Sequence, residues 1–204
     1  WTGRVGQRAE QVEGRGDAEL FRVFRRAVRV SNYDNLKNID LIYGKDNTKK
    51  GRIDLMIKNK IQRGERTIII LDGDGSKKRT RQSLGKLFKQ KLIKKKDVFI
   101  FKYNIELAFP PEILFSAIKK YICYFKLRKN ISLKQVSKII AQKGDFIKNC
   151  SRALETNIDK VVFDRMLGYI LAYEGYKNFR EIMEKKPPYN KYEIYRFLEF
   201  IAKR

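Results

Sequence analysis

The apolar run TIIIL at residues 67–71 constrains the fold of this 204-residue chain more than any other segment. Its side chains do not alternate between apolar and polar, which is typical of a strand buried on both faces at the centre of a parallel sheet. Further strands are expected at residues 37–44 and 97–103, and helices from residue 17, over 53–61 and over 84–92. This alternation predicts a doubly wound α/β layer with right-handed crossovers.

The second half of the chain has a different character. Pro110 and Pro111 begin a helix whose apolar positions recur at helical spacing, and shorter helical patterns continue to the C-terminus. We therefore interpret residues 1–109 as an α/β domain and residues 110–204 as a C-terminal helical subdomain.

The charge of the chain predicts its partner. The sequence holds 47 Lys and Arg against 23 Asp and Glu, which gives a formal net charge of +24. A partner of opposite sign relieves the self-repulsion of such a surface, and nucleic acid gains further from counterion release. The alternative is a basic, solvated surface without a partner. No apolar run approaches a membrane-spanning length and no signal peptide is evident, so we expect a cytoplasmic protein without a membrane partner.

The absence of histidine limits the chemistry. It excludes Ser-His and Cys-His catalysis and every imidazole-based metal site. The two cysteines, Cys123 and Cys150, lie far apart and fit no metal-ligand spacing. A metal would therefore be held by oxygen, which indicates a hard cation such as Mg²⁺ or Mn²⁺.

The pair Asp72 and Asp74 follows the central apolar run directly, with only Gly73 between them. If the strand geometry continues, both carboxylates point the same way at the carboxyl end of the strand, where ligands of open α/β sheets bind. Adjacent carboxylates repel unless a cation lies between them. The alternative is an Asp-Gly turn neutralised by nearby Lys and Arg. A calcium loop would need Gly at position 77 and Glu at position 83, but the sequence has Lys77 and Ser83, so this motif is excluded. No phosphate-binding P-loop motif occurs either.

Other acidic residues are expected at the same edge of the sheet. Glu13 precedes a glycine turn, Asp17 lies at the start of the first helix, and Glu106 comes just after the last strand. Because the carboxyl ends of parallel strands share an edge, these side chains should gather with Asp72 and Asp74.

These phrases resemble the Toprim domain, the metal-binding fold of topoisomerases, bacterial primases and some nucleases. VEGRGDAELF matches its E-G-x-x-D phrase, IIILDGDG matches the strand that ends in Asp-x-Asp, and NIELAFPPEIL is similar to the OLD family and related anti-phage defence nucleases. The resemblance covers about residues 11–115. It implies a Toprim-like parallel sheet flanked by helices.

The resemblance also implies functional residues. The metal ligands would be Glu13, Asp17, Asp72, Asp74 and Glu106, with Glu13, Asp72 and Asp74 as the catalytic set. OLD-type nucleases use a lysine after the core, for which Lys143 and Lys148 are candidates, although a solvated role is the alternative for each. These proteins also carry an ATPase domain, so an ATPase partner domain or subunit is expected. We also expect a homo-oligomer.

A basic cluster follows the Asp pair and consists of Lys77, Lys78, Arg79 and Arg81. It is a candidate site for backbone phosphates. Basic residues at a helix N-terminus interact unfavourably with the helix dipole, and a role in binding phosphates would explain why they stand there. The function expected is a metal-dependent endonuclease in phage defence, acting on DNA, with RNA or tRNA as the alternative. Two other functions stay open: a topoisomerase- or primase-like Toprim enzyme, and a non-catalytic nucleic-acid-binding or assembly subunit.

Overall fold

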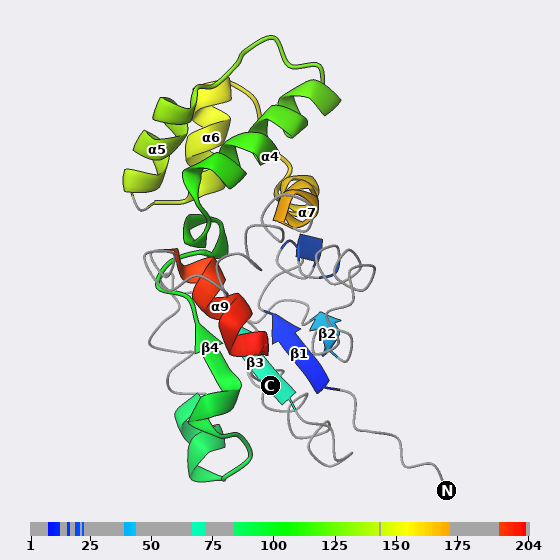
Figure 1. The fold of residues 1–204 in the computed structure, drawn as a ribbon, viewed down its shortest axis with the longest axis vertical. Helices are drawn as coiled ribbons and strands as arrows, with labels where there is room; N and C mark the ends of the chain where they lie inside the picture. Colours follow the sequence, from blue (N-terminus) through cyan, green and yellow to red (C-terminus); the bar gives the residue numbers. More distant parts are fainter. Residues whose placement is uncertain are drawn as a thin grey trace, which may run out of the picture.

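The fold is that of a mixed α/β protein in which a small parallel sheet is flanked by helices (Figure 1). The computed structural model describes residues 8–12, 16, 19–20, 22, 39–43, 67–71, 84–142, 144–171 and 192–202. The strands are β1 (Arg8–Val12), β2 (Ile39–Tyr43), β3 (Thr67–Leu71) and β4 (Val98–Ile100). The α-helices with defined bounds are α4 (Pro111–Tyr124), α5 (Leu133–Ala141), α6 (Phe146–Leu154), α7 (Lys160–Ile170) and α9 (Glu193–Ala202), and η2 (Lys95–Asp97) and η3 (Ile105–Ala108) are 3₁₀ turns.

The four described strands form one sheet with the order β2-β1-β3-β4, and every pairing is parallel. Val12 pairs with Tyr43 at the ends of β1 and β2, and Leu71 pairs with Ile100 at the ends of β3 and β4. The carboxyl ends of the strands therefore share one edge, which faces α4 to α7 (Figure 1).

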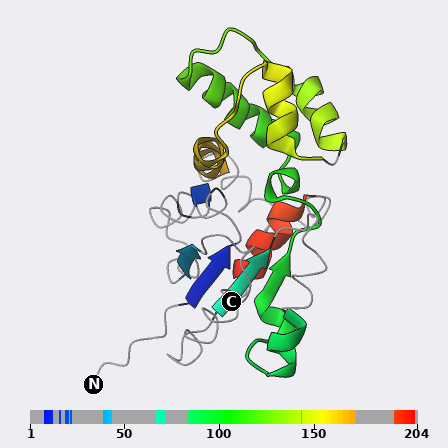
Figure 2. The ribbon, with the colours of Figure 1, turned by 180° about the vertical axis from the view of Figure 1, so that it is seen from behind.

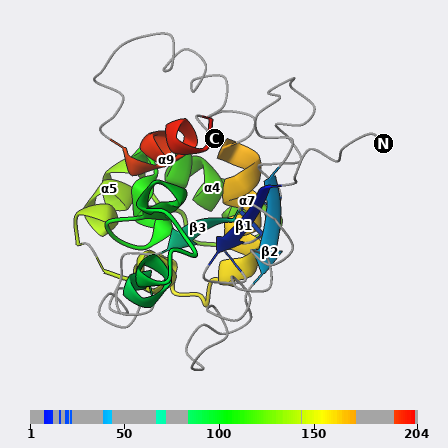
Figure 3. The same cartoon turned by 90° about the horizontal axis from the view of Figure 1, so that it is seen from below.

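Strand β3 is buried on both faces, as its apolar run predicts. Ile68 and Ile70 belong to the main hydrophobic core, whereas Ile69 lies in a second cluster with Leu84 and Leu87. Seen from below, α9 and the helical segment 84–89 lie on opposite sides of the sheet (Figure 3). This alternation of burial follows from the two-residue repeat of a strand, and it confirms a parallel sheet covered by helices on both faces.

The helices after β4 begin at side-chain caps or at proline. Pro111 occupies the first turn of α4, where its missing N–H costs no hydrogen bond. Ser132 and Gln135 form a capping box at α5, and Asp145 and Asp159 accept backbone N–H bonds at the starts of α6 and α7. Helices α4 to α6 lie together at one end of the molecule in both ribbon views (Figures 1 and 2).

Helix α9 returns from the C-terminal part of the chain to the sheet. The Phe197 ring lies 5.1 Å from the Phe99 ring and 5.3 Å from the Phe101 ring, in edge or tilted arrangements. The backbone N–H of Lys102 donates to both carboxylate oxygens of Glu193, at 2.9 and 2.8 Å. One hydrophobic cluster thus joins residues on both sides of the expected boundary between residues 109 and 110. The division into two domains stays a prediction.

The element expectations agree with the structure where residues are described. Residues 39–43 and 67–71 are strands, residues 84–89 are helical, and α4 begins at Pro111. The strand expected over 97–103 is shorter, at Val98–Ile100. The helix expected over 53–61 lies outside the described residues. In the part of the chain that the structure describes, no helix combines the length and apolarity needed to cross a membrane.

Candidate active site at the carboxyl edge of the sheet

The candidate site lies where the order of the strands reverses. The chain passes from β1 outward to β2 and then returns to β3 on the other side of β1, so the switch point lies between β1 and β3. In doubly wound sheets, the crevice at this point binds ligands outside the carboxyl ends of the strands. Val12 and Leu71 are the last residues of the two strands. Glu13 and Asp72 are the next residues in the sequence.

Most of the predicted site residues lie outside the described part of the chain. They are Glu13, Asp17, Asp72, Asp74, Lys77, Lys78, Arg79, Arg81 and Lys143. Their roles stay predictions. Glu106 and Lys148 are the two predicted site residues that the structure places.

Glu106 lies in η3, which follows the carboxyl end of β4 and leads into α4. Its side chain is fully buried, with 0% exposure, and its Oε1 lies 2.9 Å from the Nζ of Lys160. A buried carboxylate loses its hydration, so a cation at this distance offsets part of that cost. The Lys160 side chain is 42% exposed, and its stem therefore extends from the buried acid toward solvent.

Lys160 is positioned by the start of α7. The carboxylate of Asp159 caps this helix by accepting the backbone N–H of Val162 at 3.1 Å. The backbone N–H of Asp159 itself donates to the hydroxyl of Tyr121 on α4, at 2.9 Å. These two bonds fix the first turn of α7 against α4, and they place the first residue of the helix beside η3.

Asp164 lies one turn after Lys160 on the same face of α7, and it is also fully buried. It lies against Gly16, which belongs to the helical segment after β1. A Cβ atom at position 16 would overlap the Asp164 carboxylate and lie 3.1 Å from the Cε of Lys160. Gly16, three residues after Glu13 in the sequence, therefore meets the face of α7 that carries Lys160 and Asp164.

A second contact joins the same two segments. Glu19 accepts from the guanidinium groups of Arg22 at 2.6 Å and Arg165 at 3.3 Å. Partial burial acts to raise the pKa of Glu19, but the two arginines outweigh it, so its pKa is lower than usual. Glu19 is ionised at neutral pH and bridges the helical segment after β1 to α7.

Cys150 on α6 is buried, and the charge of Glu106 affects the pKa of its thiol. Burial and, second, the Glu106 carboxylate raise the pKa of the Cys150 thiol to about 12. The thiol is neutral at physiological pH, and such a group is a poor nucleophile and a poor metal ligand. Cys150 therefore contributes apolar surface beside Glu106.

Lys148, a candidate for the lysine after the core, is exposed on α6. Its Nζ lies 3.3 Å from the Oδ2 of Asp145, the N-cap residue of the same helix. Lys160 instead reaches Glu106 directly. Sequence reasoning missed Lys160 and Asp164, although the phrase DKVVFD carries a signal: a capping aspartate followed by Lys and Asp four residues apart on one helical face.

The site thus combines groups from three separate segments of the chain. Glu106 comes from η3, Lys160 and Asp164 come from α7, and Gly16 comes from the segment after β1. Within the described ranges, no three acidic or cysteine side chains gather closely enough to hold a metal ion. A complete oxygen cage at this edge would need the carboxylates that follow β1 and β3 in the sequence.

Comparisons with known proteins give no relative from which a role could be transferred. No protein-family model, curated protein or solved structure matches the chain.

Proposed function

We propose that this protein is a metal-dependent endonuclease with a Toprim-like sheet, which hydrolyses phosphodiester bonds in nucleic acid. The observation that supports this most is the contact of the buried Glu106 with Lys160, at 2.9 Å, beside the carboxyl ends of parallel strands. The strand order adds a switch point at the ends of β1 and β3. In the sequence, Glu13 and the Asp72–Asp74 pair follow those two ends.

The donor chemistry at this edge fits a hard divalent cation. Glu106 provides a carboxylate excluded from solvent, further carboxylates follow β1 and β3 in the sequence, and the chain has no histidine. We infer that Glu13, Asp17, Asp72, Asp74 and Glu106 hold Mg²⁺ or Mn²⁺. When bound, such an ion polarises a phosphate and lowers the pKa of a coordinated water.

Lys160 takes the role that the sequence resemblance gives to a lysine after the core. Its ammonium is held by Glu106 at one side, while its stem is partly exposed. A phosphate oxygen arriving at this edge would find a positive charge that is already oriented, which favours the more negative transition state. Asp164, one turn further along α7, packs against Gly16 and so positions the segment after β1.

The substrate is polyanionic. The net charge of +24 favours nucleic acid, and the cluster from Lys77 to Arg81 follows the Asp pair directly. By analogy with the resembling nucleases, DNA is the proposed substrate and phage defence the proposed role, with RNA or tRNA as the alternative substrate. An ATPase partner and assembly into a homo-oligomer belong to the same proposal.

Cleavage of nucleic acid tests this proposal. Purified protein should cut plasmid DNA, oligonucleotides or RNA with Mn²⁺ or Mg²⁺, and EDTA should stop the reaction. Asp72→Asn and Glu106→Gln should each lower the rate by about 100-fold or more, because each removes charge that the proposed ion requires. Lys160→Ala should do the same while binding of nucleic acid persists.

Glu112→Gln is the matched control, because it removes an exposed carboxylate from the first turn of α4. It should cleave like the parent protein. Thermal unfolding of each variant separates loss of chemistry from loss of folding. Binding without any cleavage, by parent and variants alike, would instead establish a non-catalytic nucleic-acid-binding subunit. A covalent adduct through tyrosine would establish a topoisomerase-like enzyme.

A further inference from the structure

The C-terminal end of α4 carries aromatic rings and cations together on an exposed surface. We define the α4 tip as Tyr124, Phe125, Lys126, Arg128 and Lys129, all of them exposed. This end of α4 and the chain that leads to α5 lie at the far end of the molecule from the segment 84–97 (Figures 1 and 2). The tip is therefore remote from the sheet.

The two aromatic rings of the tip are unusually open for their type. Tyr124 is 70% exposed and Phe125 is 42% exposed. Their ring centroids lie 4.9 Å apart in a T-shaped arrangement, and Phe125 also packs at 4.5 Å against the buried Tyr121. Tyr121 is held by its hydrogen bond from Asp159. The aromatic pair is thus anchored at one side and open to solvent at the other.

The charge of the tip is strongly positive. Lys126, Arg128 and Lys129 follow the rings within five residues, and Glu155 pairs with Lys129. A cationic surface with open aromatic rings matches one class of ligand well. Phosphates pair with the cations, and unpaired bases stack on the rings.

Lys126 occupies a backbone position that favours glycine. Its φ is 51°, in the left-handed region, at the first position after the Phe125 cap of α4. Its N–H donates to the carbonyl oxygen of Cys123 at 3.2 Å, and Leu127 N–H donates to that of Ile122 at 3.0 Å. A glycine would close this helix end with less strain. The lysine therefore places a charge beside the rings at a local cost in stability.

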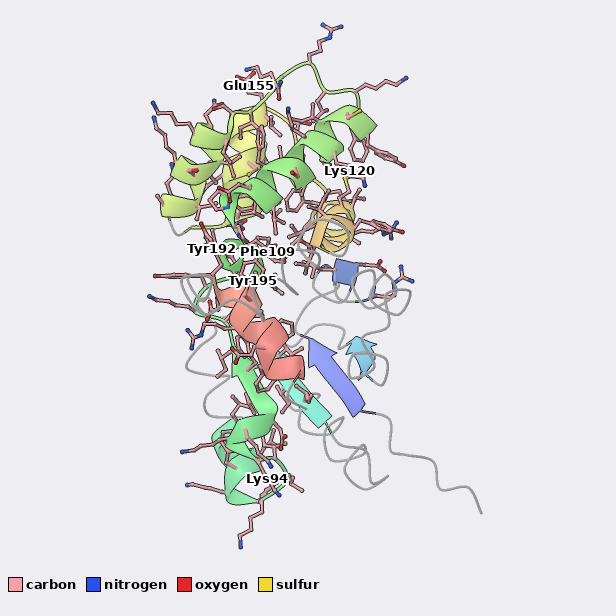
Figure 4. All side chains as sticks on the ribbon, viewed as in Figure 1. Lys94, Phe109, Lys120, Glu155, Tyr192 and Tyr195 are labelled. Carbon is pink, nitrogen blue, oxygen red and sulfur yellow. The ribbon has the colours of Figure 1, made fainter. Side chains whose placement is uncertain are left out.

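The opposite end of the molecule provides a contrast. Lys94, Lys95 and Lys96 are exposed there, and Figure 4 shows Lys94 at the other extreme from Glu155. Within residues 84–97, the one aromatic residue is Phe88, which is partly buried in a hydrophobic cluster. Both ends are basic, but of these two ends it is the α4 tip that combines cations with exposed aromatic rings.

From this combination we propose that the α4 tip binds single-stranded nucleic acid, with Tyr124 and Phe125 stacking on unpaired bases and Lys126 and Arg128 contacting phosphates. The inference rests on the proposed function in that nucleic acid is the substrate. It adds a substrate class: strands with unpaired bases. The 14-residue helix α4 separates the tip from η3, so the contact lies about 20 Å from Glu106.

Fluorescence anisotropy in EDTA tests this contact without any dependence on cleavage. The probes are a labelled 20-nucleotide oligo-dT, the corresponding oligo-rU, and a duplex of the same length. The parent protein should bind the single strands more tightly than the duplex. Tyr124→Ala should weaken single-strand binding about 5-fold or more, Tyr124→Leu should behave like Ala, and Tyr124→Phe should bind like the parent, because stacking needs the ring.

Charge variants test the phosphate contacts. Lys126→Gln combined with Arg128→Gln should weaken binding and flatten its salt dependence. Lys94→Gln combined with Lys95→Gln removes the same charge from the other end and should have a smaller effect. Lys126→Gly should also weaken binding while the protein becomes no less stable, which separates the loss of a contact from a loss of folding.

The proposal is overturned if no probe binds, if the duplex binds as tightly as the single strands, or if Tyr124→Ala binds like the parent. Equal effects of the two charge pairs would also overturn it. These results are separate from the nuclease proposal, which fails when Mn²⁺ and Mg²⁺ support no cleavage. A protein that binds single strands through Tyr124 but never cuts would retain the tip and lose the nuclease.

Discussion

At the residue scale, the main interaction of the buried Glu106 is its contact with Lys160. A carboxylate with no exposure would be costly to ionise alone, and an ammonium 2.9 Å away favours its charged form. The same α7 face carries Asp164, which meets Gly16 of the segment after β1. Three segments that are far apart in the sequence therefore depend on one another through a few polar atoms.

Gly16 should be intolerant of any side chain. In Gly16→Ala, the added methyl group would overlap the Asp164 carboxylate, so the helical segment or the Asp164 side chain must shift. We expect the free energy of unfolding to fall by about 1–3 kcal/mol. Urea unfolding followed by circular dichroism measures this change.

Gly85→Ala is the control for that substitution. Gly85 lies in the helical segment 84–89, and a Cβ atom there meets no other atom within 4 Å. Alanine should be neutral or stabilising by about 0.5–1 kcal/mol, because it restricts the unfolded chain and favours the helix. Equal stability of the two variants would show that Asp164 does not lie against Gly16.

Sequence reasoning could find Glu106 but not its partner. Glu106 follows an apolar strand, so its place at the carboxyl edge can be read from local pattern. Lys160 and Asp164 come from a helix more than fifty residues later, and nothing in their spacing says which loop they meet. The pairing depends on how α7 packs against α4 and on the Tyr121–Asp159 bond, which are long-range properties.

At the scale of elements, the pattern of apolar residues predicts one central strand of the sheet, β3, but not the other, β1. The run at β3 predicts a central strand because its four residues from Ile68 to Leu71 are all apolar, and the structure places it between β1 and β4. Strand β1, with the sequence RAEQV, lies between β2 and β3 although it carries Arg8, Glu10 and Gln11. Its place comes from backbone pairing on both sides, which an apolar pattern does not reveal.

Helix α9 should depend on Glu193 for its attachment to the sheet. Its carboxylate accepts the Lys102 N–H with both oxygens and also lies in the first turn of α9, where negative charge is favourable. We expect Glu193→Gln to lower the free energy of unfolding by about 1–2 kcal/mol. Urea denaturation provides the measurement.

Glu112→Gln serves as the comparison, because Glu112 occupies the first turn of α4 and is exposed. It should lose a few tenths of a kcal/mol from the helix dipole, roughly the lower end of the range for an exposed charge. If both variants lose the same stability, the bond from Lys102 contributes nothing measurable to the attachment of α9.

At the scale of the whole molecule, stability should fall at alkaline pH. Burial and the Glu106 charge raise the pKa of Cys150 to about 12, and burial, with smaller effects from Tyr192 and Glu112, raises that of Tyr195 to about 12. The unfolded values are near 8.5 and 10. Both groups are neutral when protonated, so their contribution is complete below these unfolded values and is lost as the pH rises toward 12.

Urea unfolding between pH 7.5 and 10 measures this effect. Cys150→Ala should flatten the decline above about pH 8.5, because it removes the thiol whose ionisation favours the unfolded chain. Cys123→Ala, which removes the exposed thiol, should leave the slope as it is. The same slope in the parent protein and in Cys150→Ala would contradict the assigned burial of Cys150.

The net charge of +24 is the property of the whole molecule that bears most on its proposed function. In the proposed function, acidic groups at the sheet edge hold a cation within a strongly basic body, and such an arrangement would attract a polyanion. The described residues supply Glu106, Lys160 and Asp164 for this edge. The acidic residues that follow β1 and β3 complete the proposed set in the sequence.

The proposed metal site is tested most directly by binding of Mn²⁺, measured by electron paramagnetic resonance of the free ion during titration of the protein. The parent protein should bind Mn²⁺, and Glu13→Gln, Asp72→Asn and Glu106→Gln should each weaken binding by about 10-fold or more, whereas Glu112→Gln should not. If the parent protein binds no Mn²⁺, or if all four variants bind it like the parent, these carboxylates form no shared metal site.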